Sequence, residues 1–496
     1  MAFGSYTASY SVDKGILSAE RVLTFKKTKL AVNEWEAYGK FVKAVVADET
    51  QFTQLVRANA GTGPTVVKRD DPKAAELLQK AAEALQRRDL SSAREALAQA
   101  EHINPQQSGL WAMYGGLYGL QGQNQKATEA LQKEIQYHPG SEPIYQMLAE
   151  LQEHAGQQDA AIATLSKLVE IAPSNSQGAV ALANLLMQQK KYTESVAPLE
   201  GALKENPNET RLELALVEAL LRQGKKADGL AVLTKLREHV SEPEDLNSAA
   251  YILADTNTDP DLAREMSEKA AAGFAEQTKD VTLTNVTSDH FALINTLGAT
   301  WDTVGWAYFR AGDMAKAEKY VTAAWVLLQH PVAADHLGQI FERQGKKAEA
   351  IHAYQLSLAA NHDQPDTRKR LENLGGAEEE APVTLRRGKP TGPPRGSLED
   401  ELSQMRTTRL PELPTRMATA EFFLLFSPAG VQDVRFIKGD EVLKTATTTL
   451  RKVHYPMTFP GEGPEKIVRR GILSCSKYTT PSCAFVLLLP ANTTTN

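Results

Sequence analysis

The sequence predicts a mainly α-helical protein in which about eight helical hairpins stack into a solenoid, and two observations carry this prediction. First, four prolines follow one another at a constant step of 34 residues, at Pro105, Pro139, Pro173 and Pro207. Second, the segments between these prolines repeat one pattern of small and large apolar residues. Because proline supplies no backbone N–H and disfavours helix in the residue before it, each proline is expected to end a helix.

The repeated pattern places small residues where the two helices of a hairpin would touch. With each proline at position 32 of its repeat, position 8 is Ala81, Gly115, Ala149 and Ala183, and position 20 is Ala93, Ala127, Ala161 and Ser195. A large side chain at either position would force the two helices apart. Position 24 is leucine in all four repeats and would fill the space behind the crossing.

Residues 72–374 resemble the tetratricopeptide-repeat family in this period and in further positions. Trp111, Gly115 and Tyr118 occupy positions 4, 8 and 11 of their repeat, as the family pattern asks. The later repeats are a fifth at 210–243, a degenerate sixth at 244–277, a polar insert at 278–289, and a seventh and an eighth that begin near Trp301 and Leu337. Pro331 is expected to end the second helix of the seventh repeat two residues late. The resemblance implies an α-solenoid that binds proteins.

The N-terminal residues 1–58 predict a β-hairpin and a helix, which together are too small for an independent core. The strands are expected at 5–12 and 16–25 and the helix at 33–47, followed by a linker at 59–71. The segment from Tyr10 to Leu23, with Asn33 to Tyr38, resembles the closing part of bacterial transglutaminase-like exported proteins that carry downstream repeats. The resemblance implies a remnant of a larger β-rich domain.

The C-terminal part predicts a flexible linker and a small α+β module. Residues 375–414 are rich in Gly, Pro and charged residues, which is typical of a linker. The module at 415–496 is expected to contain four strands, at 420–426, 431–437, 467–475 and 483–489, and a helix from Asp440 to about Lys452. Val434, Phe436, Tyr455 and Phe459 give it a resemblance to the C-terminal domain of TonB-type energy transducers, a fold used for protein contact.

Charge and hydropathy limit the classes of partner that the chain is expected to bind. The chain of 496 residues has a net charge of −6. From Ala381 onward there are 16 Lys and Arg against 10 Asp and Glu, so the preceding residues are acidic, which argues against nucleic acid as the principal partner. No run approaches the ~18 apolar residues of a membrane span. Because no leader follows Met1, the chain as written is expected in the cytoplasm, or in the periplasm or outside the cell if it is an N-terminally truncated form.

The sequence contains no recognised catalytic pattern, and we predict no enzyme activity, no cofactor and no metal site. The nearest phosphate-loop candidate, Gly61-Thr-Gly63, lacks the lysine and a following helix. His330 and His336 are six residues apart, whereas helical metal ligands are three or four apart. The two cysteines, Cys475 and Cys483, flank one loop between two expected strands. They predict a disulfide and hence export, and the alternative is a pair of inert buried thiols.

The family resemblance implies that the first helix of each repeat lines a concave groove that binds a protein or peptide partner. The candidate groove residues are Asn184, Arg211, Arg222, Asp302, Trp306, Phe309 and Arg310. Two alternatives stay open for them. The polar residues could form a solvated helix face, and a neighbouring repeat could cover Trp306 and Phe309.

The predicted function is therefore a protein-interaction scaffold. The alternative is the non-catalytic C-terminal portion of a transglutaminase-like cell-envelope enzyme. The sequence does not predict the partner or the oligomeric state.

Overall fold

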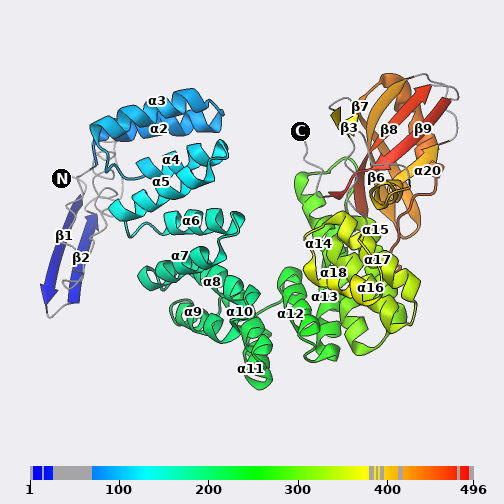
Figure 1. Ribbon diagram of the computed structural model, residues 1–496, viewed down its shortest axis with the longest axis horizontal. Coiled ribbons are helices and arrows are strands. Elements are labelled where there is room, and N and C mark those ends of the chain that lie inside the picture. The colour runs from blue at the N-terminus through cyan, green and yellow to red at the C-terminus, as the bar shows by residue number, and fades with distance from the viewer. Residues whose placement is uncertain are drawn as a thin grey trace. The chain divides into compact units, whose positions relative to one another are not determined.

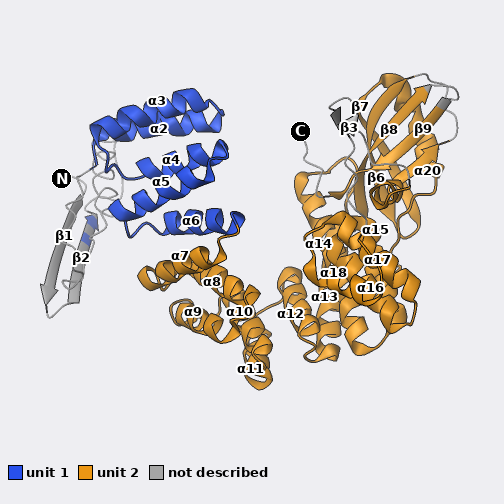
Figure 2. Ribbon diagram, viewed as in Figure 1, with its two compact units in different colours: residues 1–155 blue, residues 156–496 orange. Residues whose placement is uncertain are grey.

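The computed structural model describes residues 4–13, 16–25, 70–378, 385–386, 389–390, 396–410, 417–477 and 481–490. The chain forms two compact units, residues 1–155 and 156–496 (Figure 1) (Figure 2). Most elements of both units are α-helices, and a five-stranded sheet completes the second unit.

The first unit begins with the predicted β-hairpin. Strand β1 (Gly4–Asp13) pairs antiparallel with β2 (Ile16–Phe25), and Gly4 lies opposite Phe25. The helix predicted at 33–47 and nearly all of the linker predicted at 59–71 lie outside the described residues.

Within the described residues sixteen helices run from α2 to α17, the number that the eight predicted hairpins require. In the first unit they are α2 (Pro72–Gln86), α3 (Leu90–Ile103), α4 (Leu110–Leu120), α5 (Asn124–Tyr137) and α6 (Glu142–His154). In the second they are α7 (Gln158–Ile171), α8 (Ser176–Gln188), α9 (Tyr192–Glu205), α10 (Thr210–Arg222), α11 (Lys226–Leu236), α12 (Pro243–Asp255), α13 (Pro260–Thr278), α14 (Ser288–Ala311), α15 (Met314–Leu328), α16 (Pro331–Arg343) and α17 (Lys347–Ala360). A short helix, α18 (Pro365–Asn373), follows the last pair.

Burial confirms the register of small residues. The residues at positions 8 and 20 of the first four repeats are all buried, as is Ala317 of the seventh. A Cβ atom added to Gly338 of α16 would lie 2.3 Å from the Tyr354 ring of α17. On Gly305 of α14 it would lie 2.4 Å from Val321 of α15. These helices therefore approach too closely for any larger residue at position 8.

Prolines lie at the helix ends largely as predicted. Helices α3, α5, α7 and α9 each end two residues before one of the four evenly spaced prolines. Pro331 differs from the prediction, because it is the first residue of α16 and follows the end of α15 at Leu328. A first helical residue needs no intrahelical N–H bond, so proline fits there. The Asp313 side chain accepts the backbone N–H of Lys316 and caps α15.

The C-terminal module is an antiparallel sheet with strand order β5-β9-β8-β6-β7. Its strands are β5 (Thr407–Leu410), β6 (Ala418–Ser427), β7 (Gly430–Gly439), β8 (Ile467–Lys477) and β9 (Pro481–Leu487). The helix expected after Asp440 is a 3-10 turn (Glu441–Ala446) followed by α20 (Thr447–Lys452). The predicted linker 375–414 is wrong in part, since it contains the two-residue strands β3 (Leu385–Arg386) and β4 (Lys389–Pro390), the helix α19 (Leu398–Gln404), and β5, which pairs with β9.

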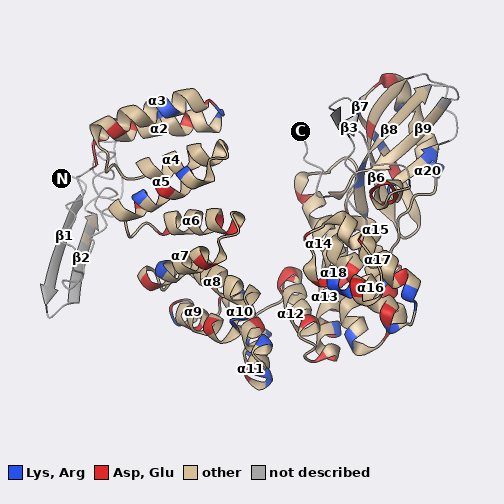
Figure 3. Ribbon diagram, in the orientation of Figure 1, with Lys and Arg blue, Asp and Glu red and all other residues tan. Residues whose placement is uncertain are grey.

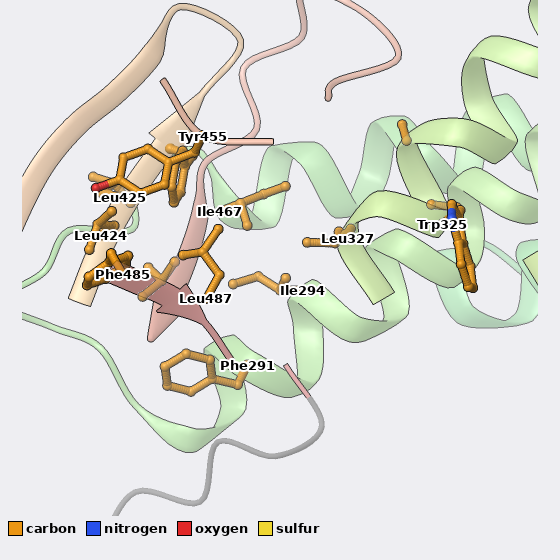
Figure 4. Close-up of a cluster of buried hydrophobic side chains, with 14 of the residues drawn as sticks. Phe291, Ile294, Trp325, Leu327, Leu424, Leu425, Tyr455, Ile467, Phe485 and Leu487 are labelled. Atoms are coloured by element: carbon orange, nitrogen blue, oxygen red, sulfur yellow. The ribbon is translucent and has the colours of Figure 1, made fainter. Parts of the chain in front are cut away.

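The sheet and the last hairpins share one hydrophobic core instead of forming separate domains. Figure 4 shows Phe291, Ile294 and Leu327 of the solenoid facing Ile467 and Leu487 of the sheet. All five side chains are buried. The boundary predicted at residue 415 therefore does not separate two independent cores.

Polar contacts reinforce this junction. Arg469 of β8 is fully buried and donates to the carbonyl oxygens of Leu488 (2.8 Å) and Leu327 (3.3 Å), the latter in the last turn of α15. A helix C-terminus favours a cation. Burial, together with the nearby positive charge of Arg406, lowers the pKa of Arg469 to about 9. Arg435 of β7 donates to the carbonyl oxygen of Leu283, so the insert predicted to be polar packs against the sheet.

The predicted disulfide is present. Cys475 of β8 lies directly opposite Cys483 of β9, and a disulfide joins them with a Cα–Cα distance of 4.1 Å. Both residues are buried. Export, which was inferred from this pairing, stays a prediction.

Candidate functional site

Helices α8, α10 and α12, the first helices of the fourth, fifth and sixth hairpins, line an open pocket of ≈ 460 Å³. We call it the α8–α12 pocket. Its apolar lining is Val180, Leu214, Ala215 and Ile252, joined by the Tyr251 ring. Its polar lining is Asn184, Arg211, Glu218, Asp245, Asn247 and Ser248. Ligand pockets in proteins commonly combine an apolar surface with a few polar groups and fall in this range of volume.

Helical spacing brings these residues to one surface. Val180 and Asn184 are four residues apart on α8, and Arg211, Leu214 and Glu218 follow one another at steps of three and four on α10. Residues so spaced share one face of a helix. Asn184 is exposed and Leu214 is buried. The pocket thus has an apolar floor and a polar rim, and it unites the predicted residues Asn184 and Arg211.

An ion-pair network lies beside the pocket. Arg222 Nε donates to Glu218 Oε1 at 2.8 Å, and Arg222 Nη2 donates to Asp255 Oδ2 at 2.7 Å. Burial lowers the pKa of Arg222, but the two carboxylates outweigh burial and raise it. Arg222, a predicted groove residue, is therefore already engaged within the protein.

The other carboxylate of the pocket, Asp245, has a different environment. None of the ion pairs among the described residues includes Asp245 or Arg211, although both line the pocket. Burial, and secondly the charge of Glu244, raise the pKa of Asp245. The Oδ1 atom of its neighbour Asn247 is buried and accepts no hydrogen bond.

The four predicted residues of the seventh hairpin form a separate cluster on α14. Trp306 is only 2 % exposed; its ring stacks on His336 of α16 (4.0 Å between centroids) and on Phe309 (4.7 Å). The Arg310 guanidinium lies 4.6 Å from the Trp306 ring centroid, and Asp302 Oδ2 lies 3.0 Å from His336 Nδ1. This burial agrees with the alternative in which a neighbouring repeat covers Trp306. Phe309 and Arg310 are partly buried.

Asp255 connects the network to this cluster, because its side chain accepts from Arg222 and its carbonyl oxygen accepts from Arg310 at 3.3 Å. Sequence analysis missed Asp245, Asn247 and Tyr251, since the sixth repeat lacks the family's marker residues. Pro243, which begins α12, was the available signal for the start of that helix and thus for its inner face.

Figure 3 shows acidic and basic residues interspersed along the described helices of both units. None of the helices in these ranges is long and apolar enough to cross a membrane. The same residues contain no group of three or more His, Cys, Asp or Glu side chains arranged to hold a metal ion.

Comparisons with known proteins identify the repeats. Residues 120–185 and 180–244 match two family models described as tetratricopeptide repeat. A search of curated proteins finds no match. The described helices thus form a tetratricopeptide-like solenoid, a fold typical of protein-interaction scaffolds. The resemblances to transglutaminase-like proteins and to TonB-type domains stay predictions, because these matches cover repeats alone.

Several solved structures are similar to the chain. A tetratricopeptide repeat protein from Parabacteroides merdae is 15 % identical, with 62 % of this chain and all of that chain covered and a TM-score of 0.40. The MamA protein is 16 % identical, with 34 % and 91 % covered and a TM-score of 0.29. A chain of the Cut9–Hcn1 hetero-tetramer of APC/C is 14 % identical, with 60 % and 55 % covered and a TM-score of 0.37.

Proposed function

We propose that this tetratricopeptide-like chain is a protein-interaction scaffold whose α8–α12 pocket holds a segment of a partner protein. The observation that carries the proposal is the pocket itself, ≈ 460 Å³ of open space with an apolar floor and a polar rim. Leu214 and Ile252 offer contact for an apolar side chain, and Asn184 offers both a donor and an acceptor to a peptide backbone.

The pocket is also the more accessible of the two candidate surfaces. Tyr251 is 37 % exposed within it, whereas Trp306 of the α14 cluster is 2 % exposed. Aromatic side chains at the centre of a protein interface often contribute most to affinity. We therefore assign the partner's contact to α8, α10 and α12, and the α14 cluster to the support of α12 and α16.

A selection of random displayed peptides on the full chain tests this function. Peptides enriched on the parent protein should lose affinity for Asn184→Arg, because an arginine at this exposed position of α8 would occupy the pocket. Glu200→Arg is the matched control, since it adds the same side chain to an exposed position of α9 in the same hairpin. Enriched peptides that bind both variants equally would contradict the proposal.

A further inference from the structure

We infer that the α8–α12 pocket recognises a lysine or arginine side chain of its partner, paired with Asp245 beside the Tyr251 ring. This inference rests on the proposed function and adds to it the chemistry of one subsite. Asp245, Tyr251 and their neighbour Asn247 belong to α12 and line the same pocket.

The first observation is that the Asp245 carboxylate makes no ion pair among the described residues. Asp245 is partly buried, and the contributions that change its pKa are burial and Glu244, both of which disfavour its charged form. Arg211 lines the pocket from α10 but makes no ion pair with it among the described residues. A partly desolvated carboxylate of this kind is stabilised by a cation that arrives with a ligand.

The second observation is an acceptor without a donor. The Oδ1 atom of Asn247 is buried and receives no hydrogen bond. A buried acceptor left unpaired is unfavourable, and turning the Asn247 side chain toward a ligand N–H in the pocket removes that cost. Ammonium and guanidinium groups carry several N–H donors and no acceptor, so such a group suits a pocket whose α12 residues offer acceptors.

The third observation is an exposed aromatic ring beside these two acceptors. Tyr251 is 37 % exposed, and its pKa is raised by burial and then by the charges of Asp255 and Asp302. A cation is attracted to the face of such a ring and to the surrounding negative potential. Glu218, the remaining carboxylate of the pocket, is already bound by Arg222. The cation subsite is therefore on α12 and not on α10.

The position of Asp245 has a simpler explanation that accounts for only part of the arrangement. Asp245 lies in the first turn of α12, where a carboxylate is favourable to the helix. Glu244 lies in the same turn and serves that purpose equally well. A helix end does not account for the unpaired Oδ1 atom of Asn247 or for the exposed ring of Tyr251.

The peptide selection, repeated on Asp245→Asn, tests the inference. Peptides enriched on the parent chain should share a lysine or arginine at one position, and Asp245→Asn should weaken their binding by about tenfold. Replacing that residue by acetyl-lysine or citrulline, which are uncharged, should cause a similar loss on the parent and little further loss on Asp245→Asn. Asp228→Asn is the matched control, because Asp228 is an exposed first-turn carboxylate of α11.

The outcomes separate this inference from the proposed function. Peptides that fail on Asn184→Arg but carry no shared basic residue, or that bind Asp245→Asn unchanged, would overturn the inference and leave the proposed function standing. Peptides that ignore Asn184→Arg would overturn both.

Discussion

The first helices of the fourth to sixth hairpins and those of the seventh and eighth carry similar kinds of side chain but use them differently. In α10 and α12 charged residues and the Tyr251 ring surround open space, with Val180 and Asn184 of α8 beside them. In α14 and α16 they close on one another, because His336, Phe309 and Arg310 cover the Trp306 ring. The region of α8, α10 and α12 leaves a surface accessible to a partner, whereas in α14 and α16 the side chains pack against one another.

The two regions also differ in what they pack against. The seventh hairpin packs against the sheet through Phe291 and Leu327, and the Leu327 carbonyl oxygen accepts from the buried Arg469 of β8. The sixth repeat is the least regular, and its helix α12 supplies five of the pocket residues. The open pocket therefore lies away from the hairpin that supports the sheet.

The largest expected effect is on the closed region. Trp306→Ala should lower the free energy of unfolding by about 3–5 kcal/mol, because it removes a buried aromatic side chain and leaves a cavity. Tyr251→Leu, in the open pocket, should change it by less than about 1 kcal/mol. Urea unfolding of the full chain, followed by far-ultraviolet circular dichroism, measures both. Equal losses would show that the two regions do not differ in burial.

The next effect concerns the sheet that is joined to the closed region. Replacing Cys475 and Cys483 together by alanine should destabilise the module by about 2.5 kcal/mol, from the entropy of the loop that the disulfide closes. Mass spectrometry after alkylation without reductant checks the premise. Two alkylated thiols in protein prepared from an oxidising compartment would mean that the bond does not form, and the prediction of export would lose its support.

A smaller effect is expected at the helix crossing between α14 and α15. Ala317 is fully buried, so Ala317→Leu should destabilise by about 1–3 kcal/mol through overpacking. Lys319→Leu, at an exposed position of the same helix, is the control and should stay within about 0.5 kcal/mol. If the Ala317→Leu variant unfolds like the parent, the crossing tolerates a large side chain and the repeat register is misplaced.

Much of the solenoid could be predicted because its determinants are local. The small residues at positions 8 and 20, such as Ala93 and Gly305, and the prolines near helix ends act within one hairpin. The junction with the sheet could not be predicted in this way. Leu410 and Leu398 lie in a stretch whose composition indicates a linker, and they gain a hydrophobic neighbour only after distant strands and helices have met.

The residues of the candidate site could likewise be predicted only in part. Asn184 and Arg211 are expected in the groove from their positions in the repeat of the resembled family, and both line one pocket. Trp306 was predicted as a groove residue by the same rule, but His336 of the next hairpin covers it. Its burial depends on a contact with a residue far along the sequence, which periodicity within one helix does not report.

The smallest expected effect is the pH dependence of the open pocket. Burial and Glu244 raise the pKa of Asp245 above its ordinary value of 3.8. The folded chain therefore holds this proton at pH values where the unfolded chain has lost it. Stability contributed by Asp245 then falls as pH rises from 3.8 through the raised pKa, and it is constant above that pKa.

Asp245→Asn removes this titration, so the variant should gain stability relative to the parent as pH rises through that range. The gain should be about a few tenths of a kcal/mol, because solvent screens a partly exposed carboxylate. Unfolding in urea at a series of pH values measures it. Glu244→Gln should shrink the pH dependence, since it removes the second cause of the shift. A variant whose stability relative to the parent falls with pH would mean that Asp245 is stabilised by a cation in the free protein, and the open pocket would then be as internally paired as the α14 cluster.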